Sequence, residues 1–579
     1  MPHAPEGGAP ARGTPQAAVP GPRDTHSPAL PLPVPAGIAA RVARPRSAPP
    51  PPTLADLVAA QAQWRPERTA LIDDAGEHTY GALHLRVTAL ARGLRALGVH
   101  TGDPVAVAED PCADMVALYL ATARIGAVLV PLSTRLTAAE LAVPLGMARP
   151  VLAAGSAERA EVLSAALDHC GADTTMLTGG EDTTWADCVA AAGAALPAGA
   201  GAPDPEVGPD SPHLLLFTSG TTGAPKAAVL SQRRSLGDAF GAALASGVRP
   251  DDRLLAYQPL YHTGGWDFLK QYLLAGGSAV LMRKFDPDTA LALIERHRCT
   301  SLFAVPLVLA RLLDAPRLGR TDLASLRRLM YASYEPSRLV PRAVAAFEER
   351  GARDIRLEHV YGQTEAGSFI ATLRPEDAVP DTLDAVGTPV PGVTVALLDP
   401  ALRPVQDGRT GEVCVRGESV MLGYLDDPGA TAAAFEGGWL HTGDLGVKGA
   451  DGQLRIVGRL RDMVRTAGEN VFPKEVEAAL VEHPEVLDCA VFGVPDEEWD
   501  ERVAALVVRA SGSTLTEDAL TAHLRARLAG FKLPRTLRFV AAIPKTPAGK
   551  TDRKALPGRL AADPAPSGQV PGPSGEVAR

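Results

Sequence analysis

The sequence has few cysteines, few aromatic residues and no long apolar run. Its six cysteines lie far apart without a C-x-x-C pair, which argues against a disulfide framework or a zinc site and favours reduced thiols. No apolar stretch approaches the length of a membrane span, and the N-terminus lacks the basic-then-apolar order of a secretory signal. A net charge of -10 argues against a general binder of nucleic acid or anionic membranes. We therefore expect a cytoplasmic protein with no nucleic-acid partner and no membrane span.

The remaining composition is that of a globular protein with more than one domain. Apolar residues make up 46% and charged residues 21% of the chain, and 579 residues are too many for a single core. Residues 1–52 are dense in Pro, Ala and Gly and cannot bury enough apolar surface to offset the entropy of ordering, so we expect a disordered extension. Residues 558–579 have a similar composition and are expected to form a disordered tail.

The order of apolar segments predicts an α/β fold. Strand-like segments precede helix-like ones along the chain, which favours a layered domain with parallel sheets over residues 53–461. The expected strand and helix pairs are 104–110 with 114–127, 127–132 with 137–148, and 278–285 with 288–298. From 387 to 458 short strands and turns predict a β-rich subdomain, and residues 462–557 read as a small, mobile α+β domain.

One loop combines glycines, hydroxyl residues and a lysine in an unusual order. The stretch "LLFTSGTTGAPKAA", Leu215 to Ala228, follows a buried strand over Leu214–Phe217 with glycines, hydroxyls and a lysine. Its amides, hydroxyls and the Lys226 ammonium form a concave set of donors suited to a polyphosphate. The P-loop of the usual NTPases is excluded, since Ala224 and Pro225 precede the lysine. A plain turn is the alternative.

Four further segments carry residue types that suit a nucleotide. "VYGQTEAG" (360–367) offers an aromatic face for a base and a carboxylate for Mg2+. "WLHTGDLG" (439–446) presents Asp444, whose two oxygens can accept both hydroxyls of a ribose. "VGRLRDMVRTAGENVFPKEVE" (457–477) places an arginine at the domain junction, and "IPKTPAGKTDRKAL" (543–556) places a lysine near the end of the last domain. Taken alone, each segment is also compatible with a turn or a solvated face.

Together, these ordered motifs resemble the adenylate-forming superfamily of acyl-CoA synthetases, peptide-synthetase adenylation domains and luciferases. The resemblance runs from about Thr53 to Leu556 and is greatest for acyl- and aryl-CoA ligases. It implies that a carboxylic acid attacks the α-phosphorus of ATP to give an acyl adenylate and pyrophosphate. It also implies ATP, Mg2+ and coenzyme A as cofactor or co-substrates.

The resemblance assigns roles to residues of this chain. The phosphates of ATP would be held by Thr218, Ser219, Gly220, Thr221, Thr222, Gly223 and Lys226. Tyr361 would stack on adenine, Gln363 would contact the nucleotide, Thr364 would touch the α-phosphate and Glu365 would bind Mg2+. Asp444 and Arg459 would fix the ribose, and Lys550 would bridge the carboxylate and the α-phosphate. An ammonium suits that task because it is a compact charge on a long stem. An exposed tail lysine is the alternative for Lys550.

A second step, thiol attack on the adenylate, is implied by the same resemblance. It would follow rotation of the small domain about a hinge at Arg461, which removes Lys550 from the site. The rotated face would carry Gly468 and Asn470, with the glycine leaving room for the pantetheine arm of CoA. For Gly468 a simple loop glycine is the alternative.

The acyl pocket is where the sequence departs from the family pattern. By resemblance His262 orients the substrate carboxylate, while Trp266 and Gly362 line the pocket, although a histidine or an aromatic there can also belong to the core. Most relatives carry small residues just before Pro336, but here the three positions are Ser333, Tyr334 and Glu335. Bulk and a carboxylate would shrink the pocket and suit a polar or amino- or hydroxy-substituted aromatic acid, unless Glu335 turns outward to solvent.

The identity of the acyl acceptor is open at this stage. We expect an acid:CoA ligase. A related enzyme could instead pass the acyl group to a separate carrier protein, or use another nucleophile or oxyanion such as nitrite. A non-enzymatic binding module would be expected to lack Lys550 or Glu365, and both are present.

Overall fold

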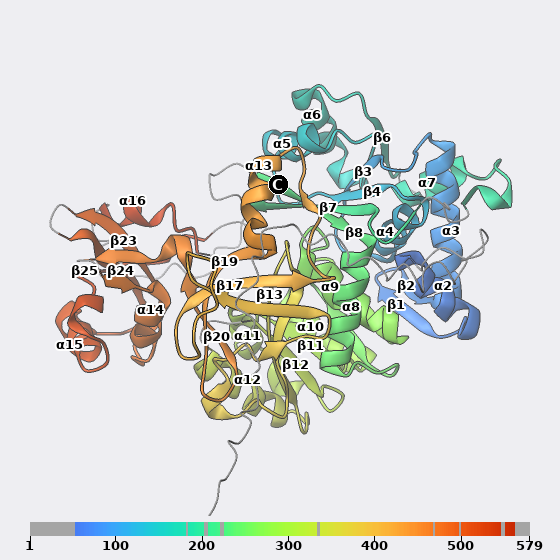
Figure 1. The fold of residues 1–579 in the computed structure, drawn as a ribbon. Coiled ribbons are helices and arrows are strands. Elements are labelled where there is room, and N and C mark those ends of the chain that lie inside the picture. Colours follow the sequence, from blue (N-terminus) through green and yellow to red (C-terminus); the bar gives the residue numbers. More distant parts are fainter. Residues whose placement is uncertain are drawn as a thin grey trace, which may run out of the picture. The chain divides into compact units, whose positions relative to one another are not determined.

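The computed structural model describes residues 53–180, 183–201, 207–219, 225–332, 336–466, 469–496, 499–545 and 551–561. These ranges lie within one compact unit, Pro49–Arg579 (Figure 1). The predicted disordered extension, 1–52, lies outside the described residues, as does the tail from 562 onward.

The first sheet is parallel in its centre and antiparallel at both edges. Its strand order is β15-β14-β13-β12-β11-β9-β10-β1-β2, and the pairs from β1 to β13 run parallel. The strands are β1 (Thr69–Asp73), β2 (Gly76–Thr79), β9 (Arg253–Ala256), β10 (Ser278–Leu281), β11 (Ser301–Ala304), β12 (Arg328–Tyr331), β13 (Arg356–Gln363), β14 (Gly367–Leu373) and β15 (Thr388–Pro389). Buried aliphatic and aromatic residues in the central strands account for their position between helices.

A second sheet contains the strand of the glycine-rich loop. Its order is β18-β8-β7-β4-β3-β5-β6, in which β7 pairs parallel with β4 and antiparallel with β8. The strands are β3 (Pro104–Ala108), β4 (Val128–Pro131), β5 (Leu152–Gly155), β6 (Thr175–Thr178), β7 (Pro212–Ser219), β8 (Pro225–Ser231) and β18 (Gly423–Tyr424). The predicted strand over 214–217 is therefore confirmed, with Leu214 to Leu216 buried and Phe217 half-buried.

Helices follow the strands, as the alternation in the sequence predicts. They are α2 (Leu54–Trp64), α3 (Tyr80–Ala96), α4 (Ala113–Ile125), α5 (Ala138–Ala148), α6 (Ala160–Cys170), α7 (Trp185–Ala192), α8 (Gln232–Ser246), α9 (Thr263–Ala275), α10 (Pro287–His297), α11 (Pro306–Leu313) and α12 (Pro336–Glu348). Helix α10 shows the local signals clearly. Asp286 caps its first turn by accepting from the amide of Thr289, Pro287 occupies the first turn, and basic residues occupy the last.

The β-rich segment forms a separate antiparallel sheet. Its order is β16-β17-β19-β20, with α13 (Pro428–Ala434) before β19. The strands are β16 (Val393–Leu398), β17 (Gly411–Gly417), β19 (Leu440–Lys448) and β20 (Leu454–Arg459). This agrees with the short strands predicted between 387 and 458.

The chain after Val464 has hydrophobic cores of its own. Its sheet has the order β22-β21-β24-β23, and β25 pairs with β24. The elements, orange to red in Figure 1, are β21 (Val464–Thr466), β22 (Glu469–Val471), α14 (Pro473–Val481), β23 (Val486–Asp496), β24 (Asp500–Arg509), α15 (Glu517–Arg525), β25 (Thr536–Phe539) and α16 (Leu556–Ala561). Helix α16 runs past the predicted start of the disordered tail at 558. It does so because Leu556 is buried and Leu560 packs against the same small core.

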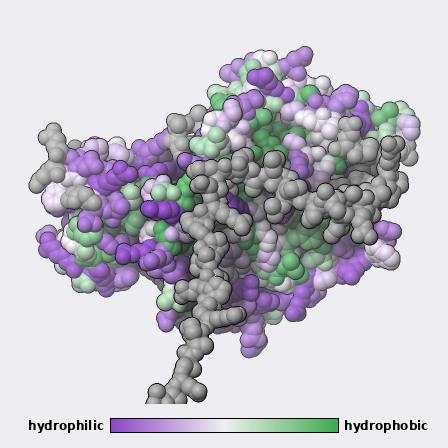
Figure 2. Space-filling view, viewed as in Figure 1, coloured by the Kyte–Doolittle hydropathy of each residue, from purple (hydrophilic) through white to green (hydrophobic). Residues whose placement is uncertain are grey.

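The overall class is the predicted one: a mixed α/β fold with parallel sheets, a large first part and a small α+β second part. On the face drawn in Figure 2, hydrophilic side chains cover much of the coloured surface and hydrophobic ones gather in smaller areas between them. Within the described ranges, no helix is both long enough and apolar enough to cross a membrane.

Candidate active site

Several predicted site residues lie where parallel strands of the first sheet end. Strand β13 ends at Gln363, and the turn 364–366 leads into the antiparallel strand β14. His262 lies after the carboxyl end of β9, as the N-cap residue of α9. In open α/β sheets, ligands bind outside the carboxyl ends of the strands. The fold thus brings the motif residues to the edge at which binding is expected.

Three predicted nucleotide-binding residues are in direct contact. The Tyr361 hydroxyl donates a hydrogen bond to Oδ2 of Asp444 over 2.9 Å. Nε of Arg459 lies 2.9 Å from Oδ1 of the same carboxylate. Asp444 and Arg459 face each other across the β19–β20 ladder, and Asp444 is only 2% exposed. The strand register therefore joins two motifs that are separate in the sequence.

Strand β8, which carries Lys226, connects to the predicted magnesium ligand Glu365 through a tyrosine. Thr218 and Lys226 are paired across β7 and β8, and the Lys226 ammonium lies 4.9 Å from the ring centroid of Tyr424. The Tyr424 hydroxyl donates to Oε1 of Glu365 over 3.0 Å. Burial, and then the charge of Glu365, raise the pKa of this phenol above its usual value. Sequence reasoning missed Tyr424, which belongs to a two-residue strand.

A buried group of charges supports the turn that carries Thr364 and Glu365. Arg234 donates two hydrogen bonds to Asp267, over 2.6 and 3.0 Å, and both side chains are fully buried. Nη2 of Arg234 also donates to the carbonyl oxygen of Thr364 over 3.3 Å. Asp267 accepts from the amide and the hydroxyl of Ser368, over 3.0 and 2.8 Å. The helices α8 and α9 thus hold both ends of the turn.

Two more charges complete this buried group. The ammonium of Lys270 lies 2.8 Å from Oδ1 of Asp267, and Asp238 accepts from the amide of Phe369 over 3.4 Å. Burial acts to raise the pKa of Asp267, but the charges of Arg234 and Lys270 outweigh it and hold that pKa below the usual value. Burial and the neighbouring Asp267 raise the pKa of Asp238. Asp267 and Lys270, three residues apart in a largely apolar helix, were a partial sequence signal, but no spacing linked them to Arg234.

The two predicted acyl-pocket residues on α9 differ in environment. His262 is exposed, and its ring centroid lies 4.7 Å from that of Tyr261. Trp266 is fully buried and stacks on Tyr119 with ring centroids 4.2 Å apart. This position favours the alternative in which Trp266 belongs to the core. Gly362 is required by close packing, since an added Cβ would lie 2.3 Å from the carbonyl oxygen of Gly367.

The predicted hinge and thiol-face residues lie around the start of the second part. Arg461 is in a short 3-10 turn, Leu460–Asp462, with its Nε 3.6 Å from Asp462, and Asn470 is exposed on β22. Near them Lys474, at the start of α14, is half-buried beside Asp444 and Arg459. Burial is the main cause that lowers the pKa of this lysine to about 7, and the attraction of Asp444 opposes it.

Several predicted residues lie outside the part of the chain that the structure describes. They are Gly220, Thr221, Thr222, Gly223, Ser333, Tyr334, Glu335, Gly468 and Lys550, and the side chain of Ser219 is likewise not described. Their roles remain predictions. Gln363 ends β13 and is half-buried, next to the turn described above.

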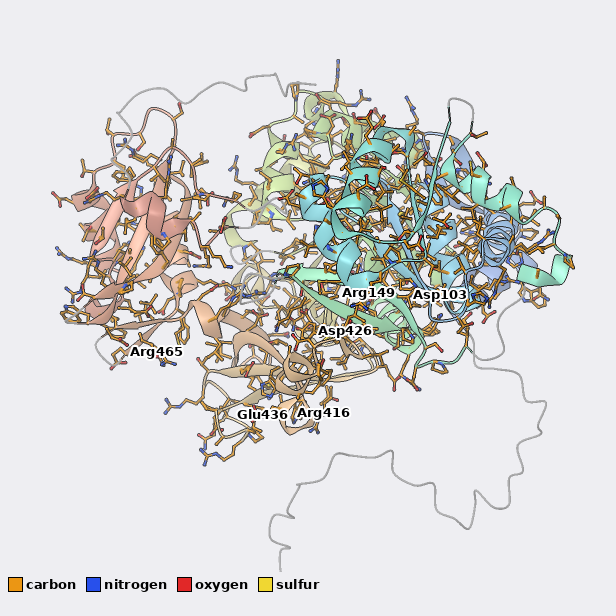
Figure 3. The ribbon with its side chains drawn as sticks, turned by 90° about the horizontal axis from the view of Figure 1, so that it is seen from above. Asp103, Arg149, Arg416, Asp426, Glu436 and Arg465 are labelled. Carbon is orange, nitrogen blue, oxygen red and sulfur yellow. The ribbon has the colours of Figure 1, made fainter. Side chains whose placement is uncertain are left out.

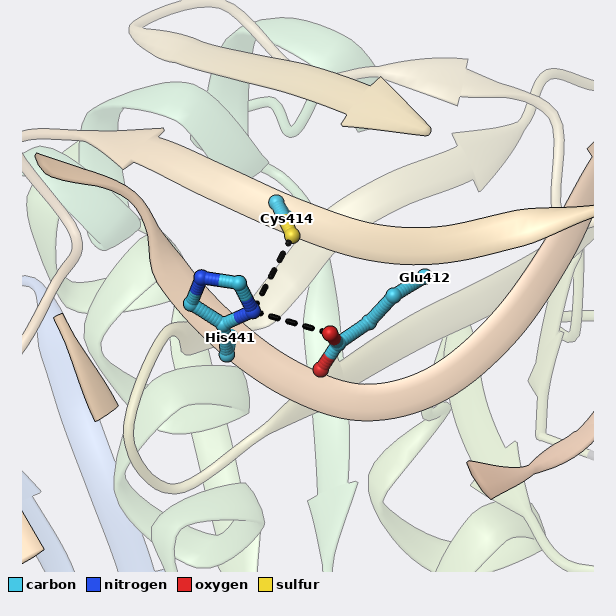
Figure 4. A group of neighbouring side chains, drawn as sticks. All are labelled: Glu412, Cys414 and His441. Carbon is cyan, nitrogen blue, oxygen red and sulfur yellow. Dashed lines mark hydrogen bonds and ion pairs between the residues drawn. The ribbon is translucent and has the colours of Figure 1, made fainter. Parts of the chain in front are cut away.

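On the strand that bears Asp444 and on its neighbour β17, three potential metal-ligating side chains lie close together. The ligand atoms of Glu412, Cys414 and His441 are all within 4.8 Å of one another (Figure 4). Burial and the nearby Glu412 charge raise the pKa of the Cys414 thiol to about 12. Sequence reasoning assigned this cysteine no role and did not single out Glu412 or His441.

Comparison with family models decides the relationship of this chain. The model of the AMP-binding enzyme matches residues 58–425, and that of the AMP-binding enzyme C-terminal domain matches residues 475–550. The chain belongs to the AMP-binding enzyme family. It is thus a member of the adenylate-forming superfamily and an AMP-forming ligase of the acyl-CoA synthetase type, as the motifs predict.

Named members of the AMP-binding enzyme family share about a third of their residues with this chain. A feruloyl-CoA synthase from Amycolatopsis is 35% identical over 500 residues, covering 85% of this chain and 95% of that protein. The 3-[(3aS,4S,7aS)-7a-methyl-1,5-dioxo-octahydro-1H-inden-4-yl]propanoyl:CoA ligase of Mycobacterium tuberculosis is 39% identical, covering 85% and 96%. A fatty acid–[acyl-carrier-protein] ligase of Streptomyces coeruleorubidus is 33% identical over 519 residues, covering 88% and 97%.

Solved structures of the AMP-binding enzyme family agree with the fold. ATP-bound MatB from Rhodopseudomonas palustris has a TM-score of 0.78 and 32% identity, covering 87% of this chain and 98% of that one. The amide bond synthetase McbA from Marinactinospora thermotolerans has a TM-score of 0.76 and 32% identity, covering 87% and 99%. The anthranilate CoA ligase AuaEII in complex with anthranoyl-AMP has a TM-score of 0.78 and 26% identity, covering 89% and 98%.

Proposed function

We propose that this enzyme activates a small carboxylic acid as its acyl adenylate and then transfers the acyl group to coenzyme A. The observation that carries the proposal is the contact of Tyr361, Asp444 and Arg459. Tyr361 lies on β13, directly before the turn that bears Thr364 and Glu365. The aromatic ring, the buried carboxylate and the guanidinium suit the base and ribose of a nucleotide. ATP-bound MatB, which shares the fold, supports the assignment.

In the first step, an oxygen of the acid attacks the α-phosphorus of ATP. The bond between that phosphorus and the bridging oxygen breaks, and pyrophosphate leaves. Positioning and cations carry this step, because two anions must be brought together. Lys226 and the glycine-rich loop hold the leaving phosphates, and Lys550 spans the acid and the α-phosphate.

Magnesium fits the residues on this turn. The half-buried carboxylate of Glu365 is a hard oxygen donor held in place by Tyr424, and Mg2+ prefers one or two carboxylates together with phosphate oxygens and water. Glu365 would hold the ion, which would offset phosphate charge. Tyr424 orients the carboxylate toward strand β8, because its ring also lies beside Lys226.

In the second step, the CoA sulfur attacks the carbonyl carbon of the adenylate and AMP leaves. The sulfur loses its proton to solvent, and the product is a thioester. Rotation about Arg461 replaces Lys550 by the face that carries Gly468 and Asn470. Separate cores for the residues after Val464 support such a movement.

For the acid itself, we propose a polar or amino- or hydroxy-substituted aromatic substrate. If Glu335 lies at the pocket floor, as the resemblance implies, its carboxylate would attract such a substituent. The names of the feruloyl-CoA synthase and the anthranilate CoA ligase among the similar proteins support this class. Changing Glu335→Ala should reverse the ranking of amino-substituted against unsubstituted benzoic acids in pyrophosphate release. An unchanged ranking would disprove the role of Glu335.

The second candidate is a different acyl acceptor at the same site. The carrier-protein ligase and the amide bond synthetase among the similar proteins favour a carrier thiol or an amine, and nitrite in place of the acid is a further variant. A screen of carboxylates for ATP-dependent pyrophosphate release identifies the acid. Mass analysis of products with CoA, a carrier protein or an amine then identifies the acceptor, and the same analysis with nitrite instead of the acid tests that variant. Formation of acyl-CoA is expected, and adenylate release without any CoA thioester would refute the first candidate.

A further inference from the structure

The strand that presents Asp444 contains an unusual bulge. In the β17–β19 ladder Glu412 pairs with Leu445, and Cys414 pairs with His441. One residue of β17, Val413, therefore opposes three residues of β19, 442–444. Bulges next to active sites re-aim side chains, and this one ends at the carboxylate that contacts Tyr361 and Arg459.

The backbone of the bulge is held by side chains, since the regular ladder is interrupted there. The amide of Gly443 donates to Oε1 of Glu412 over 3.0 Å, and the amide of Asp444 donates to Oγ1 of Thr442 over 3.0 Å. The Thr442 hydroxyl donates in turn to the carbonyl oxygen of Val413 over 2.7 Å. Gly443 has a φ of 70°, which favours glycine. Glu412 thus fixes the residue directly before Asp444.

The second oxygen of Glu412 is fixed by a histidine. Nδ1 of His441 lies 2.8 Å from Oε2 of Glu412, and Nε2 lies 3.1 Å from the carbonyl oxygen of Glu436 (Figure 4). The turn of Glu436 is tied down by Arg416, whose Nε donates to the carbonyl oxygen of Gly438 over 2.6 Å; Figure 3 labels Arg416 and Glu436 side by side. Both oxygens of the carboxylate are therefore committed to β19.

The distances favour hydrogen bonds over a metal centre among these side chains. Nδ1 and Oε2 are 2.8 Å apart, whereas two ligands of one tetrahedral zinc ion would be about 3.3 Å apart. Oε1 is already taken by the Gly443 amide. The Cys414 sulfur is 3.6 Å from Nδ1 and fully buried. The group accordingly acts through Glu412 on the bulge.

We propose that Glu412, oriented by His441, is a positioning residue for the recognition of the ribose hydroxyls of ATP. It acts by holding the Gly443 amide, so that the Asp444 carboxylate faces the sugar. The proposal rests on the proposed function, in which Asp444 binds the ribose. It requires that Glu412 affect the binding of the ATP ribose and not the binding of the acid.

The test compares ATP with 3′-deoxy-ATP and 2′-deoxy-ATP in steady-state pyrophosphate release. A hydroxyl hydrogen bond to a carboxylate is worth about 10- to 150-fold, so the parent enzyme should prefer ATP to a deoxy analogue by at least about tenfold in kcat/KM. Glu412→Ala should reduce this preference to about twofold or less and raise the KM for ATP, with the KM for the acid unchanged. Glu412→Gln should restore most of the preference, because its carbonyl oxygen can still accept from Gly443.

Controls separate positioning from general damage. Asp407, paired with Lys448 at the far end of β19, offers an exposed carboxylate outside the bulge, and Asp407→Ala should keep the parent preference. If circular dichroism shows that Glu412→Ala does not fold, Glu412→Asp replaces it as the test variant. This change shortens the side chain by one methylene and should reduce the preference for ATP at least fivefold. Full preference in Glu412→Ala, or in Glu412→Asp, would overturn the proposal.

Two further results are informative. If Asp444→Ala keeps the parent preference for ATP, the ribose assignment of the proposed function fails. If Asp444→Ala loses this preference while Glu412→Ala keeps it, only the positioning role of Glu412 fails. Metal analysis of the purified parent protein should find no stoichiometric transition metal that is lost in Glu412→Ala. Finding such a metal would overturn the hydrogen-bonded arrangement.

Discussion

Replacing Asp267 by asparagine should destabilise the enzyme strongly. The carboxylate is fully buried and lies 2.6 Å from Arg234 and 2.8 Å from Lys270. Asparagine has the same size and can still accept from Ser368, but it carries no charge. Arg234 and Lys270 are both buried cations, and Asp238 would then be the remaining anion of this group. Breaking a buried ion pair from one side costs about 3–5 kcal/mol.

Urea unfolding followed by tryptophan fluorescence measures this loss, since Trp266 is stacked in the same core. We expect Asp267→Asn to lower the free energy of unfolding by about 3–5 kcal/mol. Asp251→Asn is the matched control, because that carboxylate is 64% exposed and pairs with Arg327 over 2.7 Å; its loss should be about 1 kcal/mol or less. The double change Arg234→Met with Asp267→Leu should cost less than Asp267→Asn alone, since no uncompensated partner of the pair remains. A loss for Asp267→Asn no larger than that for Asp251→Asn would refute this reasoning.

Three other outcomes are expected. Burial holds the pKa of His213 well below its usual value, so below pH 6.5 the unfolded chain binds a proton that the folded chain does not. The free energy of unfolding should therefore fall between pH 7 and pH 5, by up to about 1.4 kcal/mol per pH unit. Urea titrations of His213→Gln should show a smaller dependence of this free energy on pH. Tyr361→Phe removes the hydrogen bond to Asp444 and should raise the KM for ATP about 3- to 10-fold, with an unchanged KM contradicting the contact. Lys550→Ala should abolish adenylate formation yet spare thiol transfer from a preformed adenylate, and equal loss of both steps would count against the rotating small domain.

The proximity of three candidate residues was predictable from short motifs that resemble those of a known family. Tyr361, Asp444 and Arg459 were placed at one site from three separate motifs, and the structure brings them into contact. The alternation of strands and helices likewise follows from apolar runs and caps that are local in the sequence. Such signals need no knowledge of tertiary contacts.

The supporting residues could not be found in this way. Tyr424 reaches Glu365 through a strand of two residues, too short for any periodic pattern. Arg234 and Asp267 lie on different helices, and no sequence spacing links them. The position of α16 beyond residue 557 depends on a small core formed by β23 and β24, so composition alone misjudged it. These features arise from packing between distant segments.

The hairpin of β1 and β2 has a consequence for synthesis of the chain. Leu71 pairs with Ala279 of β10, so the hairpin leaves the ribosome well before the strand that covers its open edge. At about 5–20 residues per second, the interval is on the order of 10–40 s. An isolated two-stranded hairpin is only marginally stable in water. During translation, the apolar residues 70–72 therefore remain without their partner strand β10 until that strand has been synthesised.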